Sequence, residues 1–276
     1  MDRTLYICPV CSEPMIMDAK SWRCPSGHCF DIASKGYVNL LTTAGKNPKN
    51  AGDNAAMVKA RTDFLDKGYY APLADRIADM ISARASVFAV DSGCGEGFYT
   101  ARIAEKCPDC FFAGVDISKT AIAHCMTRVH QKKLSNTAFA VGSSYKLPFP
   151  DSSADELFCI FAPVANDEYA RVLKKDGRLI VVSPTSDHLF ELKAAVYDEP
   201  YKNRPNKYGL DSFVLEDEYS LEYKEEITSQ DDIYALFSMT PYFYRTSETG
   251  MARLKALDKC DVTIGFLIQS YRNNKI

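Results

Sequence analysis

The sequence lacks a long apolar run, a strong net charge and more than a few histidines or tryptophans. No stretch approaches the roughly 20 apolar residues of a membrane span, and the segment after Met1 has no apolar run of signal-peptide length. We therefore expect a cytoplasmic protein without membrane partners, whose ten cysteines stay reduced. The formal charge of -3 over 276 residues gives no overall indication of a nucleic-acid partner.

The cysteines near the start of the chain have the spacing of zinc ligands. Cys8 and Cys11 form a CxxC pair, and Cys24 and His28 form a CxxxH pair farther along. Each pair fits a tight turn, and a short hairpin between them would bring the four side chains into a tetrahedron. Cys29 is an alternative fourth ligand, and cysteines that are simply buried are the alternative to a metal site. The spacing predicts one structural zinc ion.

After residue 85, short apolar runs alternate with helical segments. The expected strands are 86–95, 110–118, 137–144, 154–163 and 177–185, and the expected helices are 98–106, 119–133 and 167–175. Strands that are apolar nearly throughout and separated by helices indicate a parallel sheet covered on both faces. The sequence therefore predicts a doubly wound, Rossmann-like α/β domain.

Glycines and acids follow the first two expected strands. Asp91 is followed by Gly93, Gly95 and Gly97 in the loop DSGCGEG, where glycine permits a tight turn against a ligand. Asp116 closes the second strand, where an acid can accept hydrogen bonds from both ribose hydroxyls. Because such sheets bind ligands at the carboxyl ends of their strands, the loop and the acid together predict a nucleoside-containing cofactor.

The loop favours S-adenosylmethionine over a dinucleotide. Its glycines run GxGxG, one residue short of the GxGxxG fingerprint, and Glu96 places an anion where a pyrophosphate would meet helix-terminal amides. S-adenosylmethionine has no phosphate and carries cationic groups, so we expect the carboxylates of Asp91 and Glu96 to be favourable beside it. The alternative is that Asp91 caps a turn and Glu96 is solvated.

The order of the motifs resembles one family. The zinc pattern, FDIASKGYVNLL, GDNAAMVKARTDFLDKGYYAPL, VDSGCGEGFYT and SPTSDHLFELK occur in the same order in the bacterial large-subunit (23S) ribosomal RNA guanine-N1 methyltransferases. The resemblance implies a zinc-binding RNA-recognition module over 1–42, a helical linker over 43–85 and an S-adenosylmethionine-dependent methyltransferase domain over 86–276. It also implies a homodimer that methylates N1 of a guanine in an rRNA hairpin loop. In some members of one branch of the family this methylation contributes to macrolide resistance.

The resemblance also assigns residues, position by position. The CxxC and CxxxH residues are assigned to zinc, and Tyr70, the Gly95-Glu96-Gly97 turn and His188 are assigned to the surroundings of the cofactor. Phe161, after the fourth expected strand, stands where many base methyltransferases hold the target ring. No general base is assigned.

Aromatic residues of the N-terminal module are candidates for stacking on unpaired RNA bases. They are Tyr6, Trp22, Phe30 and Tyr37, of which Trp22 is the best candidate for an exposed ring; the alternative is that they form the core of the module. The run EDEYSLEYKEE is expected to be a solvated acidic segment. Two other functions stay open: a small-molecule methyltransferase with a zinc module, and a catalytically silent RNA-binding protein.

Overall fold

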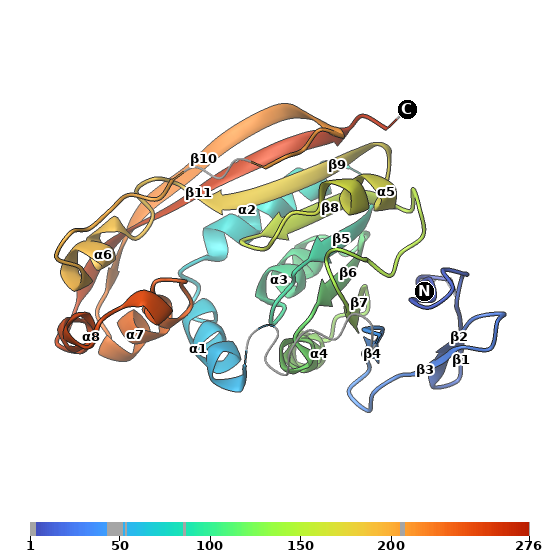
Figure 1. Ribbon diagram of the computed structural model, residues 1–276, viewed down its shortest axis with the longest axis horizontal. Helices are drawn as coiled ribbons and strands as arrows, with labels where there is room; N and C mark the ends of the chain where they lie inside the picture. The colour runs from blue at the N-terminus through green and yellow to red at the C-terminus, as the bar shows by residue number, and fades with distance from the viewer. Residues whose placement is uncertain (1–3, 43–51, 53, 85–86, 205–207, 276) are drawn as a thin grey trace.

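The computed structural model describes residues 4–42, 52, 54–84, 87–204 and 208–275 (Figure 1). At its centre is an eight-stranded sheet with the strand order β10-β11-β9-β8-β5-β6-β7-β4. Five neighbouring strands of this sheet, which we call the inner strands, are β5 (Phe88–Ser92), β6 (Phe111–Asp116), β7 (Thr137–Val141), β8 (Ala154–Ile160) and β9 (Leu173–Pro184). Each of these strands pairs in parallel with its neighbours among the five. The predicted doubly wound α/β fold is confirmed.

The crossover helices lie close to where the sequence predicts them. They are α3 (Phe98–Lys106), α4 (Lys119–Lys132) and α5 (Asn166–Val172). Helix α4 begins where the Ser118 side chain accepts a hydrogen bond from the Ala121 amide, a normal N-terminal cap. Helix α3 begins at Gly97, whose positive φ of 84° suits glycine and turns the chain from the loop into the helix.

The sheet buries both of its faces. Successive residues of β8 alternate between two cores, so that Phe158 and Ile160 lie on one side and Leu157 and Cys159 on the other. The first side packs against α2 (Ala71–Ser82), α3 and α1 (Ala55–Leu65). The second side packs against α5 and the N-terminal residues. The N-terminal segment thus covers the sheet directly.

A long antiparallel arm extends the sheet beyond β9 (Figure 1). Strands β10 (Phe213–Ile227) and β11 (Cys260–Asn273) pair along their whole length, with one irregularity between Leu215 and Asp217. Between them lie α7 (Gln230–Ser238), the 3-10 turn η2 (Phe243–Arg245) and α8 (Glu248–Lys255), and α6 (Phe190–Val196) follows β9. The run EDEYSLEYKEE is therefore part of a strand, and its side chains are mostly exposed because β10 is an edge strand.

The N-terminal residues form a small antiparallel sheet of β1 (Ile16–Asp18), β2 (Ser21–Arg23) and β3 (Cys29–Asp31). The next strand, β4 (Val38–Asn39), pairs in parallel with β7 at the edge of the large sheet. The boundary of the zinc-binding module at residue 42 stays a prediction. Strand β4, which lies within that module, is part of the large sheet. Within the described ranges, no helix is both long enough and apolar enough to cross a membrane.

Candidate functional site

The four predicted zinc ligands meet at one point. The ligand atoms of Cys8, Cys11, Cys24 and His28 all lie within 4.8 Å of one another. The Sγ atoms of Cys11 and Cys24 are 3.6 Å apart, close to the separation of about 3.8 Å expected for two thiolates on one tetrahedral zinc ion. Cys29 is exposed on β3 and lies outside this group, so His28 is the fourth residue. The four residues fit one zinc ion.

Hydrogen bonds and a ring contact join the zinc site to the larger domain. The Pro9 carbonyl, between the first two ligands, accepts a hydrogen bond from Lys146 Nζ at 2.9 Å. The Ile7 amide donates to the Pro148 carbonyl at 3.0 Å, and the Tyr6 ring lies against Phe149 at 5.6 Å. Residues 146–149, which follow β7, are therefore held in place by contacts with the zinc-binding segment.

The aromatic residues of the N-terminal segment are mainly core residues. Trp22 is only 3% exposed and packs edge-on against Tyr6 with ring centroids 4.9 Å apart. Tyr37 is also buried, and Phe30 is partly buried against the same core. The expectation that Trp22 is exposed to stack on RNA is wrong, because the ring is buried in a hydrophobic core that the zinc module shares with one face of the sheet.

A cavity of about 1230 Å³ opens at the carboxyl ends of the inner strands. Its walls include Gly93, Gly95 and Glu96 from the loop after β5, Asp116 from β6, Phe161 after β8 and His188 after β9. Tyr70, which precedes α2, also lines it. The structure thus brings most of the predicted cofactor residues to one cavity, although they come from five separate segments.

The glycine loop allows a close approach of the backbone. Gly93 has a φ of 81°, and a Cβ atom there would lie 2.5 Å from the Ala162 side chain. Gly97 has a φ of 84°, and a Cβ atom would lie 2.9 Å from Cys125 Sγ. Any side chain at these positions would both strain the turn and displace a neighbour. This explains why glycine occurs at both positions.

Asp116 lies at the carboxyl end of β6 with both carboxylate oxygens directed by backbone amides. Oδ2 accepts from the Gly95 amide at 3.0 Å, and Oδ1 accepts from the Ser118 amide at 2.8 Å. These bonds join the acid to the glycine loop and orient it at the cavity wall. This is a suitable position for an acid that binds ribose.

The carboxylates of Asp91 and Glu96 are engaged inside the protein. Asp91 is buried away from the cavity lining and accepts from Thr100 Oγ1 at 2.5 Å; burial raises its pKa to about 7. Glu96 accepts from Arg128 Nε at 2.5 Å. Burial alone would raise the pKa of Glu96, but His124 and Arg128 outweigh it and lower that pKa. The geometry does not support the expected attraction between these two carboxylates and a cationic cofactor.

His188 and Tyr70 form a hydrogen-bonded pair. The Gly265 amide donates to His188 Nδ1 at 3.1 Å, and His188 Nε2 lies 3.4 Å from the Tyr70 hydroxyl. Burial lowers the pKa of His188 to about 4, so the ring is neutral at pH 7. Because Nδ1 accepts, the proton of the neutral ring is on Nε2 and donates to Tyr70. The Tyr70 hydroxyl is then left to donate its own proton elsewhere.

Phe161 has an unusual backbone for an aromatic residue. Its φ is 54°, in the left-handed region, and its amide donates to the Val182 carbonyl at 3.1 Å. The ring is 44% exposed in the cavity and lies parallel to the His188 ring within 28°. Strained backbone of this kind is often found at functional sites.

The sequence did not predict the residues on the outer side of the cavity. They are Tyr145, Tyr201, Lys202, Arg204 and Arg245, which line the opening and are all exposed. Together with Phe161 we call these six residues the cavity mouth. Their exposed aromatic rings and positive charges come from four distant segments, and only Phe161 stands next to a recognisable motif.

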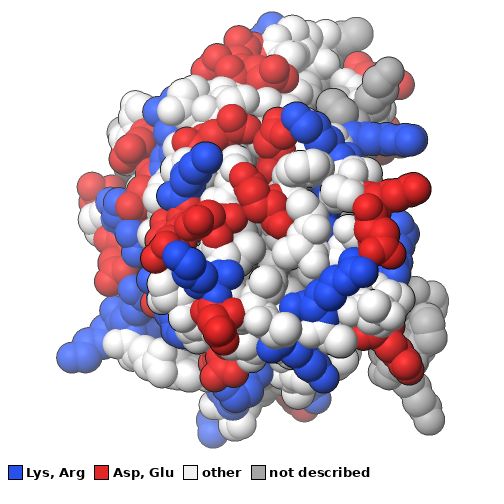
Figure 2. Space-filling model, turned by 90° about the vertical axis from the view of Figure 1, so that its left-hand side faces the viewer, with Lys and Arg blue, Asp and Glu red and all other residues white. Residues whose placement is uncertain are grey.

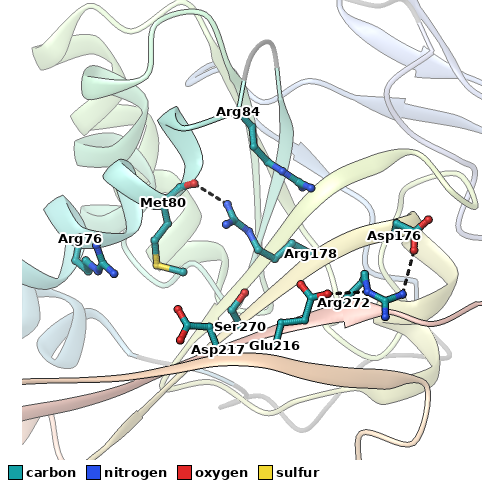
Figure 3. A pocket seen from close by; sticks show the side chains of 9 residues that line it. All are labelled: Arg76, Met80, Arg84, Asp176, Arg178, Glu216, Asp217, Ser270 and Arg272. Atoms are coloured by element: carbon teal, nitrogen blue, oxygen red, sulfur yellow. Dashed lines mark hydrogen bonds and ion pairs between the residues drawn. The ribbon is translucent and has the colours of Figure 1, made fainter.

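A second cavity, of about 440 Å³, lies at the other end of the sheet (Figure 3). It is also lined by arginines, but several of these are neutralised. Arg178 bonds to the buried Glu156 at 2.6 Å, and Arg272 bonds to Glu216 at 2.7 Å and to Asp176 at 3.1 Å. These bonds hold β9, β10 and β11 together, and the arrangement is that of a structural ion-pair network.

Two family models match the chain. The model described as RlmA, N-terminal matches residues 6–49, which include the zinc ligands. The model described as Methyltransferase domain matches residues 85–238, which include most of the cavity. The large domain therefore has the class I fold of S-adenosylmethionine-dependent methyltransferases.

Curated relatives match over much or nearly all of the chain. YxjB of Bacillus subtilis, whose name places it among the 23S rRNA (guanine-N(1)-)-methyltransferases, is 31% identical over 96% of this chain and 95% of its own. A protein of Micromonospora griseorubida with the same type of name is 37% identical over 67% of each chain. The 23S rRNA (guanine(748)-N(1))-methyltransferase of Streptomyces fradiae is 38% identical over 68% of this chain and 66% of its own. This chain belongs to the family of 23S rRNA (guanine-N1)-methyltransferases that carry an N-terminal zinc ribbon.

Proposed function

We propose that the protein transfers a methyl group from S-adenosylmethionine to N1 of a guanine in 23S rRNA. The observation that carries the proposal is the cavity at the carboxyl ends of β5, β6, β8 and β9, which is lined by the glycine loop, Asp116 and the exposed Phe161. Membership of the rRNA guanine-N1 methyltransferase family supports the choice of substrate.

The residues on the inner wall fit S-adenosylmethionine. Asp116, oriented by two amides, would bind the ribose hydroxyls. The Tyr70 hydroxyl, which accepts from His188, has its own proton to donate, and among the described residues it has no acceptor. A carboxylate such as that of the methionine end would accept this proton. Bound there, S-adenosylmethionine supplies a methyl group that its sulfonium has already activated.

The contribution of the protein is mainly alignment. The transfer would form a bond between guanine N1 and the methyl carbon while the bond from that carbon to the cofactor sulfur breaks, which releases the cofactor as a neutral thioether. The N1–H bond would break as well, and its proton would pass to water. The cavity, at about 1230 Å³, is larger than a typical small-molecule site of roughly 300–1,000 Å³, which leaves room for a base beside the cofactor. His188 does not take the N1 proton, because Nδ1 accepts from Gly265 and Nε2 carries the proton donated to Tyr70. Alignment of the methyl group with guanine N1 inside the cavity would by itself be a large source of rate acceleration.

Incubation with methyl-labelled S-adenosylmethionine and an unmodified 23S rRNA transcript tests the proposal. We expect 1-methylguanosine in a nuclease digest, and a reverse-transcription stop at one hairpin-loop guanine, because an N1-methyl group blocks base pairing. Label on another base atom, or RNA that stays unlabelled, would contradict the proposal. The rival small-molecule methyltransferase would label no RNA, and a silent RNA-binding protein would transfer no methyl group at all.

The family likeness also supports a homodimer that works in the cytoplasm. One chain has a mass of 30.8 kDa, so light scattering should give about twice that value for the free protein. A value that stays at one chain mass across the micromolar range would contradict the dimer, without bearing on the reaction. Loss of the protein would also be expected to change sensitivity to macrolides if its target guanine is one that affects their binding.

A further inference from the structure

Lys193 is a buried lysine without an acidic partner. Its side chain, on α6, is 0% exposed, and among the described residues no carboxylate lies within ion-pair distance of it. Its Nζ donates instead to the Tyr201 carbonyl at 3.1 Å and to Asn203 Oδ1 at 2.6 Å. The same ammonium lies 4.7 Å from the centre of the Tyr201 ring and 4.4 Å from that of Tyr242. Burying a charge is costly, so these contacts indicate that Lys193 fixes the segment it touches.

Asn203 connects that segment to the cofactor side of the cavity. Its Nδ2 donates to the Thr185 carbonyl at 2.9 Å and to the His188 carbonyl at 3.0 Å. Its Oδ1 accepts from Lys193 and from the Tyr242 hydroxyl at 2.5 Å. All four hydrogen-bonding positions of the amide are thus used. Through these bonds, segment 201–204 is held beside the turn that carries His188.

The outward side of this segment has the properties of a surface for single-stranded RNA. The Tyr201 ring is 49% exposed, and Arg204 and Arg245 are exposed with no ion pair among the described residues. Among the described residues, the acids that line the cavity are Glu96 and Asp116, and both are bonded within the protein. Exposed rings and unpaired arginines are the groups that bind unstacked bases and phosphates.

The positive charge is local. On the end of the molecule that carries α6 and α8, acidic and basic side chains are interspersed without a wide field of one sign (Figure 2). Lys202, for example, is paired with Asp187 at 2.7 Å. A surface of this kind suits a few phosphates of a loop rather than a long duplex.

We propose that segment 201–204 and Arg245 form the surface that binds the nucleotides flanking the target guanine, and that Lys193 and Asn203 position this surface against the cofactor side. The inference rests on the proposed function, because it names the RNA contacts of the same cavity. It assigns the RNA contact to the cavity mouth rather than to the buried rings of the zinc module.

The test of the surface is the double variant Arg204→Gln, Arg245→Gln, with Arg272→Gln as the matched control at the far end of the sheet. We expect the Kd for a 23S rRNA hairpin transcript to rise at least tenfold, and the slope of log affinity against log salt to fall by about 1.4 for two lost phosphate contacts. The Kd for S-adenosylmethionine should stay within twofold. Unchanged RNA affinity and salt slope in the double variant would overturn the proposal.

Lys193→Met tests the positioning role. We expect a roughly tenfold higher KM for RNA with a kcat that changes less than threefold, and faster hydrogen exchange in segment 197–204. A KM equal to that of the wild type would overturn the role of Lys193. The two proposals can fail separately, because RNA binding is measured directly. A wild-type protein that binds the hairpin but transfers no methyl group to guanine N1 would refute the proposed function. The RNA affinity of the variants would still test the surface.

Discussion

The two groups of aromatic residues in this protein lie in opposite environments. Tyr6, Trp22 and Tyr37 of the N-terminal segment are buried against the sheet. Tyr145, Phe161 and Tyr201 of the cavity mouth are between 44% and 66% exposed. The comparison shows that an aromatic ring in a small metal-binding module stabilises the fold, whereas rings at a cavity opening remain available to a ligand.

The two regions are nevertheless connected. Tyr145 is followed directly by Lys146, which donates to the Pro9 carbonyl of the zinc loop. Pro148 and Phe149, a few residues later, contact Ile7 and Tyr6. We therefore expect zinc to influence the cavity mouth through segment 145–149, without itself touching the substrate.

Removal of zinc should have the largest effect. Chelation should unfold residues 4–40, because the four ligands are otherwise joined only by turns and short strands. Hydrogen exchange should also accelerate in segment 145–149, while β5 and β6 stay protected. Cys11→Ser should reproduce this effect, and Cys29→Ser, outside the ligand group, should not. Unchanged exchange in segment 145–149 after chelation would show that the two regions are independent.

Trp22→Ala should destabilise the protein strongly. Removing a buried tryptophan creates a cavity and costs about 3–5 kcal/mol in the free energy of unfolding. Urea unfolding followed by circular dichroism measures this. The affinity for the RNA hairpin, measured where the variant is still folded, should be unchanged. A stable variant with weak RNA binding would instead make Trp22 an RNA contact.

Tyr145→Ala should show the opposite pattern. The ring is 66% exposed, so its loss should change the free energy of unfolding by less than about 0.5 kcal/mol. Loss of a base–aromatic stack costs about 1–3 kcal/mol, which corresponds to a rise in the RNA Kd of about 5- to 150-fold. Fluorescence anisotropy with a labelled hairpin measures this rise. Equal RNA binding by variant and wild type would remove Tyr145 from the RNA surface.

His188→Gln should change the pH dependence of stability. The pKa of His188 is lowered to about 4 by burial, so between about pH 6.5 and pH 4 the unfolded chain binds a proton that the folded chain does not. This group therefore makes stability fall as the pH falls through that range, by up to about 1.4 kcal/mol per pH unit. The variant should lack this component. Asp91, whose raised pKa acts in the opposite direction, is common to both proteins.

Urea unfolding at pH 7, 6 and 5 measures the difference between the two proteins. If the free energies of unfolding of the wild type and the His188→Gln variant converge as the pH falls, the result supports a neutral, buried His188 in the folded protein. Parallel pH profiles would mean that His188 has the same pKa in the folded and the unfolded chain, and the assignment of a buried ring that stays neutral below pH 6.5 would then be wrong.

The inner part of the site could be predicted from the sequence because its signals are local. The apolar strands, the glycine loop and Asp116 follow one another within about thirty residues, and α3 and α4 lie where their patterns indicate. The zinc ligands are likewise close in sequence. Strand β10 was missed because its exposed edge is charged, although the alternation of Tyr219, Leu221 and Tyr223 is a strand signal.

The remaining errors concern contacts between distant residues. Glu96 pairs with Arg128, which is 32 positions later on helix α4. The sequence of the loop alone therefore does not show that the Glu96 carboxylate is bonded inside the protein. Trp22 is buried by Tyr6 and by the face of a sheet that begins some sixty residues later. The position of segment 201–204 depends on Lys193 and on Tyr242, 39 residues from Asn203.

Photo-crosslinking tests the central comparison most directly. The wild-type protein would be irradiated with a 23S rRNA hairpin that carries a photoreactive nucleotide beside the target guanine, and the crosslinked peptides identified by mass spectrometry. We predict crosslinks to Tyr145, to segment 201–204 or to Arg245. Crosslinks confined to Tyr6, Trp22 or Tyr37 would contradict the assignment of RNA contacts to the cavity mouth.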